Sequence, residues 1–160
     1  MQHIYTIMKK CFLLFGVFII GLSSCKKKVD NSAALQAAAD DALIQAYIKQ
    51  YNIPAVKDAS GLYYQILSPG TGPHPTLTSN ITVAYTCVLT DGTAIESKSS
   101  SYFNPLSSVI AGWGIGLPLI GTSGKILLII PSALGYGNTV HGAIPANSVL
   151  VYNITLQGFN

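Results

Sequence analysis

Apolar positions recur along the chain with three different spacings, and each spacing predicts a different kind of segment. Residues 11–22 form a continuous apolar run, whereas residues 32–51 carry an apolar side chain at about every fourth position. From Gly61 onward, apolar and polar residues largely alternate. A four-residue spacing is typical of an amphipathic helix, and alternation is typical of antiparallel strands. The pattern therefore predicts an apolar N-terminal segment, a helix and a strand-rich domain.

The predicted helix carries an apolar stripe that requires a partner. Its members are Leu35, Ala39, Leu43, Tyr47 and Tyr51, with Ile44 and Ile48 beside them. Residues 30–32 are all good N-caps, and Ile53-Pro54 ends the helix. The stripe packs either on the chain's own domain or on the same helix of a second copy. The second alternative predicts a homodimer through residues 32–51.

The residue pattern after Gly61 predicts an α+β domain. Alternating or continuous apolar residues predict strands at 62–67, 81–90, 93–97, 125–130 and 149–156. Asp91-Gly92 is a strong hairpin turn, and residues 99–104 are expected to form a polar loop. Residues 109–120 contain three glycines and a proline, which leaves at best a short, weak helix. One short helix and about five antiparallel strands make an α+β domain.

Charge is concentrated at the N-terminus and almost absent from the domain. Five of the nine Lys lie within the first 28 residues, and there is no Arg. From Gly61 onward the charged residues are Asp91, Glu96, Lys98 and Lys125. A domain with so few cations cannot make the phosphate contacts on which nucleic-acid affinity depends, so we expect no nucleic-acid partner.

Cysteine number and spacing predict a domain without metal, cofactor or disulfide. The three cysteines are Cys11, Cys25 and Cys87, and no zinc-ligand spacing occurs. Cys87 lies in an alternating strand, where we expect a small buried thiol.

The first 25 residues are arranged as an export signal. Lys9 and Lys10 precede the twelve-residue apolar run, which is too short for a spanning helix of about 20 residues. The sequence Leu-Ser-Ser-Cys at 22–25 then resembles the lipobox of bacterial lipoproteins. The resemblance implies that residues 1–24 are removed as a signal peptide and that Cys25 is lipidated. The alternatives are an ordinary secretory signal and a short uncleaved anchor.

This interpretation divides the chain into three parts and places it in the cell envelope. Residues 25–60 would be a lipid-anchored tether with the amphipathic helix, and residues 61–160 the domain. The three lysines at 26–28 would contact anionic lipid headgroups or form a solvated start to the tether. The expected location is the periplasmic or outer-membrane side of the envelope.

Three motifs of the domain occur in a recognisable order. They are VIAGW at 109–113, IPSALGYG at 130–137 and IPANSVLVY at 144–152. Together they resemble the FKBP-type peptidyl-prolyl cis-trans isomerases across residues 61–160. The resemblance implies a curved antiparallel sheet wrapped around one short helix, with a proline-binding pocket between them. It also implies proline-containing polypeptides and macrolide inhibitors as partners.

The resemblance assigns roles to ten residues. It implies catalytic roles for Tyr85, Glu96, Ile110, Trp113 and Tyr136. Substrate-binding roles fall on Ile95, Val109, His141, Ile144 and Tyr152. The Trp113 indole would form the pocket floor, while the Ile110 N–H and the Tyr136 hydroxyl would donate to substrate carbonyls. His141 follows Tyr136 in the same loop and lies either at the pocket rim or in solvent.

Two departures from the family pattern bear on activity. The family usually has Phe-Asp where this chain has Ile95-Glu96, and an aromatic residue where it has Asn104. A less aromatic pocket predicts an isomerase of reduced activity that assists folding of exported proteins. The alternatives are a proline-binding or chaperone lipoprotein with little turnover, and a structural lipoprotein that retains only the fold.

Overall fold

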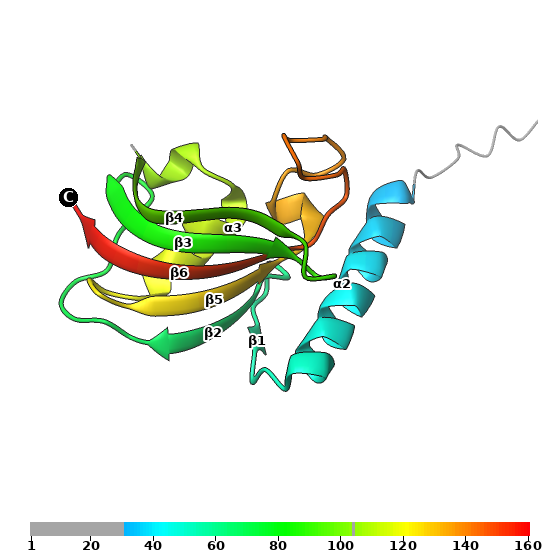
Figure 1. Ribbon diagram of the computed structural model, residues 1–160, viewed down its shortest axis with the longest axis horizontal. Coiled ribbons are helices and arrows are strands. Elements are labelled where there is room, and N and C mark those ends of the chain that lie inside the picture. Colours follow the sequence, from blue (N-terminus) through cyan, green and yellow to red (C-terminus); the bar gives the residue numbers. More distant parts are fainter. Residues whose placement is uncertain (1–30, 104) are drawn as a thin grey trace, which may run out of the picture. The chain divides into compact units, whose positions relative to one another are not determined.

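The computed structural model describes residues 31–103 and 105–160, which form one compact unit. The predicted signal peptide, the predicted lipidation site Cys25 and Asn104 lie outside the described residues. The element order begins with helix α2 (Ser32–Tyr51) and continues into a six-stranded sheet (Figure 1). In the described part of the chain, no helix combines the length and the apolar character needed to cross a membrane.

The sheet is antiparallel at every junction and confirms the predicted α+β class. Its strand order is β1-β2-β5-β6-β3-β4. The strands are β1 (Val56–Lys57), β2 (Tyr63–Ser68), β3 (Ile81–Leu89), β4 (Ala94–Phe103), β5 (Lys125–Ile130) and β6 (Leu150–Phe159). The sixth strand is the two-residue β1, which pairs with β2 at one edge and is too short to produce an alternating pattern.

The prediction of a polar loop at residues 99–104 is wrong, because β4 continues to Phe103. The strand pairs with β3 along its length, from Val88 opposite Ala94 to Ile81 opposite Phe103. β4 is the edge strand of the sheet, and most of its side chains are exposed. A serine-rich segment is compatible with such an edge, since neither its outer side nor its solvent face needs apolar residues.

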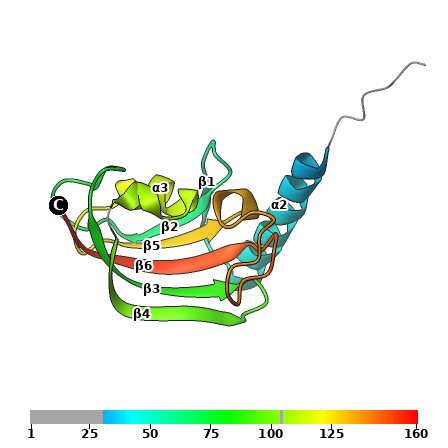
Figure 2. The same cartoon turned by 90° about the horizontal axis from the view of Figure 1, so that it is seen from above.

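The short helix α3 (Ala111–Gly116) lies against one face of the sheet (Figure 2), between the 3-10 turns Leu106–Ser108 and Leu117–Leu119. The main core fills the space between α3 and this face of the sheet, and it contains Trp113, Ile126, Leu128 and Ile130. Gly112 and Gly116 allow the close approach, because a Cβ at Gly112 would lie 2.7 Å from Ile130 and one at Gly116 would lie 2.5 Å from Leu128.

A second core joins α2 to the opposite face of the sheet. Ile44 of the helix packs with Tyr63, Leu127, Ile129 and Val151. β5 is therefore covered on both faces, by α3 and by α2. This explains why its sequence is a continuous apolar run and not an alternating one.

The bounds of the predicted helix are confirmed, but its apolar stripe does not pack as one unit. Ile44 is 1% exposed, whereas Leu35, Leu43 and Tyr51 remain 70%, 48% and 52% exposed. Four residues turn an α-helix through about 400°, so each step of a four-residue repeat drifts about 40° around the axis. Leu35 and Tyr51 are four steps apart and point in widely different directions.

Candidate active site

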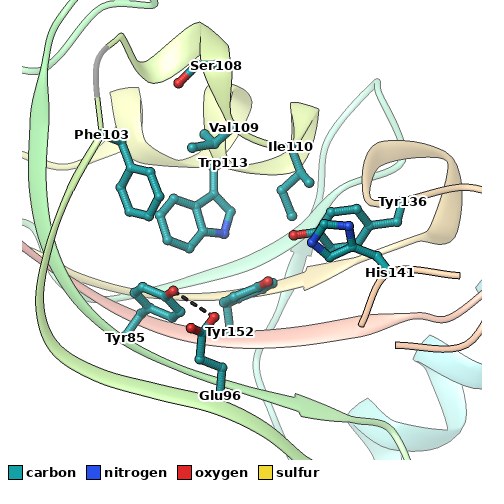
Figure 3. Close-up of a pocket in the computed structure, with 10 residues that line it drawn as sticks. All are labelled: Tyr85, Glu96, Phe103, Ser108, Val109, Ile110, Trp113, Tyr136, His141 and Tyr152. Carbon is teal, nitrogen blue, oxygen red and sulfur yellow. Dashed lines mark hydrogen bonds between the residues drawn. The ribbon is translucent and has the colours of Figure 1, made fainter. Parts of the chain in front are cut away.

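A pocket of about 500 Å³ opens between α3, β3 and β4 (Figure 3). This volume is in the usual range for small-ligand sites. Eight of the ten residues predicted from the sequence line it: Tyr85, Glu96, Val109, Ile110, Trp113, Tyr136, His141 and Tyr152. Phe103 and Ser108 complete the lining.

The indole of Trp113 lies at the centre of an aromatic cluster. The ring centroids of Tyr85, Tyr152 and Phe103 lie 5.1, 5.3 and 5.5 Å from it, each with its plane close to perpendicular to the indole. Such edge-to-face pairs are favourable because the positive ring edge meets the negative ring face. Trp113 is 3% exposed, so the cluster fixes a flat apolar floor.

Phe103 and Ser108 are the two lining residues that sequence reasoning missed, and Phe103 is the aromatic one. We expected the wall next to Asn104 to lack an aromatic ring, but the neighbouring Phe103 supplies it. Its position follows from β4, which extends to Phe103 and places that residue opposite Ile81 of β3. The sequence offered one indication of this: Phe103 directly precedes Asn104, the position at which the family often has an aromatic residue.

Glu96 interacts directly with the aromatic cluster. The Tyr85 hydroxyl donates a 2.8 Å hydrogen bond to its carboxylate, and Lys98 lies 3.3 Å from the other carboxylate oxygen. The longer side chain of Glu, compared with the family's Asp, still reaches the tyrosine. Glu96 thereby holds the Tyr85 ring at one wall of the pocket.

Two predicted binding residues do not line the pocket. The β3–β4 pairing shifts between Cys87–Glu96 and Val88–Ala94, which leaves Ile95 as an extra residue at a β-bulge. Its half-buried side chain packs against the main core. Ile144 is likewise a core residue, although its backbone exchanges hydrogen bonds with that of His141 at 2.9 and 3.0 Å. Through these backbone hydrogen bonds, Ile144 supports His141 at the pocket rim without lining the pocket itself.

Tyr136 and His141 form the mouth of the pocket. Their rings stack in parallel, with centroids 4.1 Å apart and planes 7° apart. Figure 3 shows the Tyr136 hydroxyl directed into the pocket, towards Trp113. On the same side, Ile110 has an extended backbone immediately before α3, and its carbonyl accepts the N–H of Trp113 at 3.0 Å. His141 lines the pocket and stacks on Tyr136 at its mouth, which places it at the rim and not in free solvent.

Burial keeps the pocket hydroxyls protonated. It raises the pKa of Tyr152 and, together with the hydrogen bond to Glu96, that of Tyr85 far above the ordinary tyrosine value. Burial also raises the pKa of the Tyr136 hydroxyl and of the Cys87 thiol behind the pocket. The site thus offers neutral hydroxyl donors and no ionised nucleophile among these four groups.

If the site has the isomerase activity that the family resemblance implies, kcat/KM on an uncharged prolyl peptide should stay constant between pH 8 and pH 10. An ordinary tyrosine would be about half ionised at pH 10. The raised pKa values favour the neutral form in the folded state, so their contribution to stability is complete below about pH 10 and is lost as the pH rises further. A rate halved at pH 10, with an unchanged near-ultraviolet circular dichroism spectrum, would contradict this.

The fold and the aromatic pocket define a class of protein, and the similarity of the chain to known proteins identifies that class. The family described as "FKBP-type peptidyl-prolyl cis-trans isomerase" matches residues 72–157. The chain is 36% identical over 134 residues to the isomerase FkpA of Aeromonas hydrophila, covering 82% of this chain and 49% of that protein. It is 34% identical over 145 residues to FkpA of Escherichia coli, covering 84% and 53%. The chain belongs to the FKBP-type peptidyl-prolyl cis-trans isomerase family.

Solved structures agree with this assignment. A peptidyl-prolyl isomerase from Pseudomonas syringae superposes with a TM-score of 0.69 at 28% identity, covering 80% of this chain and 96% of that one. FkpA from Escherichia coli superposes with a TM-score of 0.66 at 28% identity, covering 99% and 72%. The chain spans about half the length of the curated relatives it matches.

Proposed function

We propose that this protein is a peptidyl-prolyl cis-trans isomerase that assists folding of exported envelope proteins. The observation that carries the proposal is the position of Trp113, which forms an apolar floor surrounded by three aromatic rings, with the Tyr136 hydroxyl directed towards it. The floor suits a proline ring, and the donors at its edge suit the carbonyls that flank it.

Rotation about a prolyl bond requires neither a nucleophile nor a proton transfer. Its barrier of about 18–20 kcal/mol arises from amide resonance, and the uncatalysed step takes tens of seconds. A dry pocket favours the twisted amide, whose carbonyl is less strongly solvated than that of the planar form. A site without an ionised nucleophile can therefore catalyse the reaction.

We assign the catalytic roles to residues that line the pocket. The proline ring packs on Trp113 between Tyr85, Phe103 and Tyr152, and the Tyr136 hydroxyl and Ile110 N–H donate to the flanking carbonyls. Val109 and His141 contact the residues on either side of proline. Trp113 Nε1 is buried without a hydrogen-bond partner among the described residues.

Turnover separates this function from that of a proline-binding or chaperone module. We suggest a refolding substrate whose slow phase is limited by one prolyl bond. Catalytic amounts of the protein should accelerate that phase in proportion to their concentration. A binding module would leave its rate constant unchanged and would retain the substrate only at stoichiometric amounts.

The proposed domain organisation assigns residues 1–24 to a lipoprotein signal peptide, residues 25–60 to a tether with helix α2, and residues 61–160 to the isomerase domain. The lipid on Cys25 anchors the protein on the periplasmic or outer-membrane side of the envelope. A short apolar run followed by Leu-Ser-Ser-Cys supports this arrangement.

We expect Cys25→Ala to abolish lipidation and signal cleavage, because no other cysteine follows the apolar run directly. The variant should lose the mass of the lipid and retain residues 1–24. Cys87→Ala is the matched control, since that thiol is buried in β3, and it should be processed normally. Unchanged processing and membrane attachment of the Cys25 variant would contradict the proposal.

The proposed partners are proline-containing polypeptides, macrolide inhibitors that occupy the same pocket, and a second copy of the chain. The exposed side chains of Leu35 and Leu43, which are only two four-residue steps apart on α2, support a homodimer through residues 32–51. Sedimentation analysis at several concentrations distinguishes the dimer from a monomer.

A further inference from the structure

Helix α2 carries a buried carboxylate that the predicted tether function does not require. Asp40 is 1% exposed and lies in the middle of the helix. A carboxylate removed from water destabilises the fold by several kcal/mol unless hydrogen bonds or cations stabilise it. The ion pairs of the described residues join Lys57 to Asp41 and Lys98 to Glu96, so none of them involves Asp40.

The carboxylate is stabilised by hydrogen bonds from a loop 92 residues away. Asp40 Oδ2 accepts the backbone N–H of Ser132 at 2.8 Å and its hydroxyl at 2.6 Å. Oδ1 accepts the side-chain amide of Gln36 at 2.7 Å. Hydrogen bonds to an ionised group are about twice as strong as neutral ones. Ser132 is itself 2% exposed, so water does not compete for these bonds.

Ser132 in turn holds both sides of Tyr136. Its carbonyl accepts the N–H groups of Gly135 and Gly137, each at 2.9 Å. These glycines flank Tyr136, whose ring stacks on His141 at the mouth of the pocket. In Figures 1 and 2 the helix lies beside this loop, which connects β5 to β6. A short series of hydrogen bonds therefore leads from the helix to the backbone that carries Tyr136.

We propose that Asp40 is a positioning residue for Tyr136, which makes helix α2 a part of the catalytic unit. The Asp40 carboxylate fixes Ser132, and Ser132 fixes the turn that directs the Tyr136 hydroxyl into the pocket. Without this link the loop would retain its internal hydrogen bonds, including the bond from the Asn147 N–H to the Gly137 carbonyl, but its first turn would lose the hydrogen bonds from Ser132 to Asp40. The inference rests on the proposed isomerase function.

A double-mutant cycle in the full-length chain tests this link. We expect Asp40→Ala to lower kcat/KM on a prolyl peptide about three- to tenfold. In a Tyr136→Phe background the same change should lower it by less than about 1.5-fold, because the hydroxyl that Asp40 positions is already absent. Asp40→Asn, which keeps the shape and one acceptor oxygen, should give a smaller loss and guards against misfolding of the alanine variant.

Asp41→Ala is the matched control. Asp41 is the neighbouring carboxylate and also links α2 to the sheet, through Lys57 and the Tyr63 hydroxyl, but within the described residues it forms no hydrogen bond or ion pair with the loop. Its kcat/KM should stay within about 1.5-fold of wild type. Equal losses for Asp40→Ala in both backgrounds, or an equal loss for Asp41→Ala, would overturn the proposal.

Hydrogen exchange provides a readout that is independent of turnover. Amides in residues 132–141 should exchange at least about tenfold faster in Asp40→Ala and at the wild-type rate in Asp41→Ala. If the wild-type chain shows no isomerase activity, the proposed function fails and this comparison alone decides the role of Asp40. Unchanged exchange in Asp40→Ala would then overturn it.

Discussion

Replacing Trp113 with alanine should lower kcat/KM on a prolyl peptide roughly 50- to 100-fold. The indole is the pocket floor, and a proline ring that buries about 100 Å² of its own apolar surface against that floor gains about 2.5 kcal/mol. The free energy of unfolding should also fall by about 3–5 kcal/mol, because the change leaves a cavity between three aromatic rings. Steady-state kinetics and urea denaturation measure the two effects separately.

A control is needed because both effects originate in one side chain. Leu156 is fully buried in β6, belongs to the main core and does not line the pocket. Leu156→Ala should lower the free energy of unfolding by about 2–5 kcal/mol and leave kcat/KM within about twofold, measured where the protein is folded. Equal losses of activity in the two variants would show that Trp113 acts through stability alone.

The second large effect concerns the glycines that hold α3 against the sheet. Gly112→Ala and Gly116→Ala should each lower the free energy of unfolding by about 1–3 kcal/mol. The new methyl groups would press on Ile130 and Leu128, which are fully buried and cannot move aside. Gly112 directly precedes Trp113, so its substitution should also lower kcat/KM, by about tenfold.

Gly114 provides the matched control on the same helix. A Cβ there would meet only the tip of Leu77 at 3.0 Å, and Leu77 is 53% exposed and free to shift. Gly114→Ala should therefore be neutral or should stabilise the protein by up to about 1 kcal/mol, because alanine favours the helical backbone. If urea denaturation gave the same loss for all three variants, close packing of α3 would not be their cause.

The sequence allowed much of the sheet and the centre of the site to be predicted, because those parts depend on local patterns. Alternation located β3, and Asp91-Gly92 marked its hairpin, where Gly92 adopts φ +89°. The motifs around Trp113 and Tyr136 placed the floor and mouth of the pocket. Each of these inferences relied on residues close together in sequence.

The missed features depend on contacts between distant segments. The bulge that moves Ile95 out of the pocket arises from a register shift between β3 and β4. No residue type in this part of the sequence indicates that shift. Phe103 was missed because the serine-rich end of β4 was predicted to be a polar loop. Asp40 resembled a surface residue of a helix, because its partner Ser132 lies 92 positions further along the chain.

The isomerisation rate of a short prolyl peptide tests the central claim most directly. We suggest the chain from Lys26 onward and a peptide with an apolar residue before proline. The account predicts a rate that rises linearly with protein concentration and that falls to near the uncatalysed value with Trp113→Ala. A wild-type rate equal to the uncatalysed one, while the fluorescence of Trp113 reports bound peptide, would contradict it and indicate a binding module.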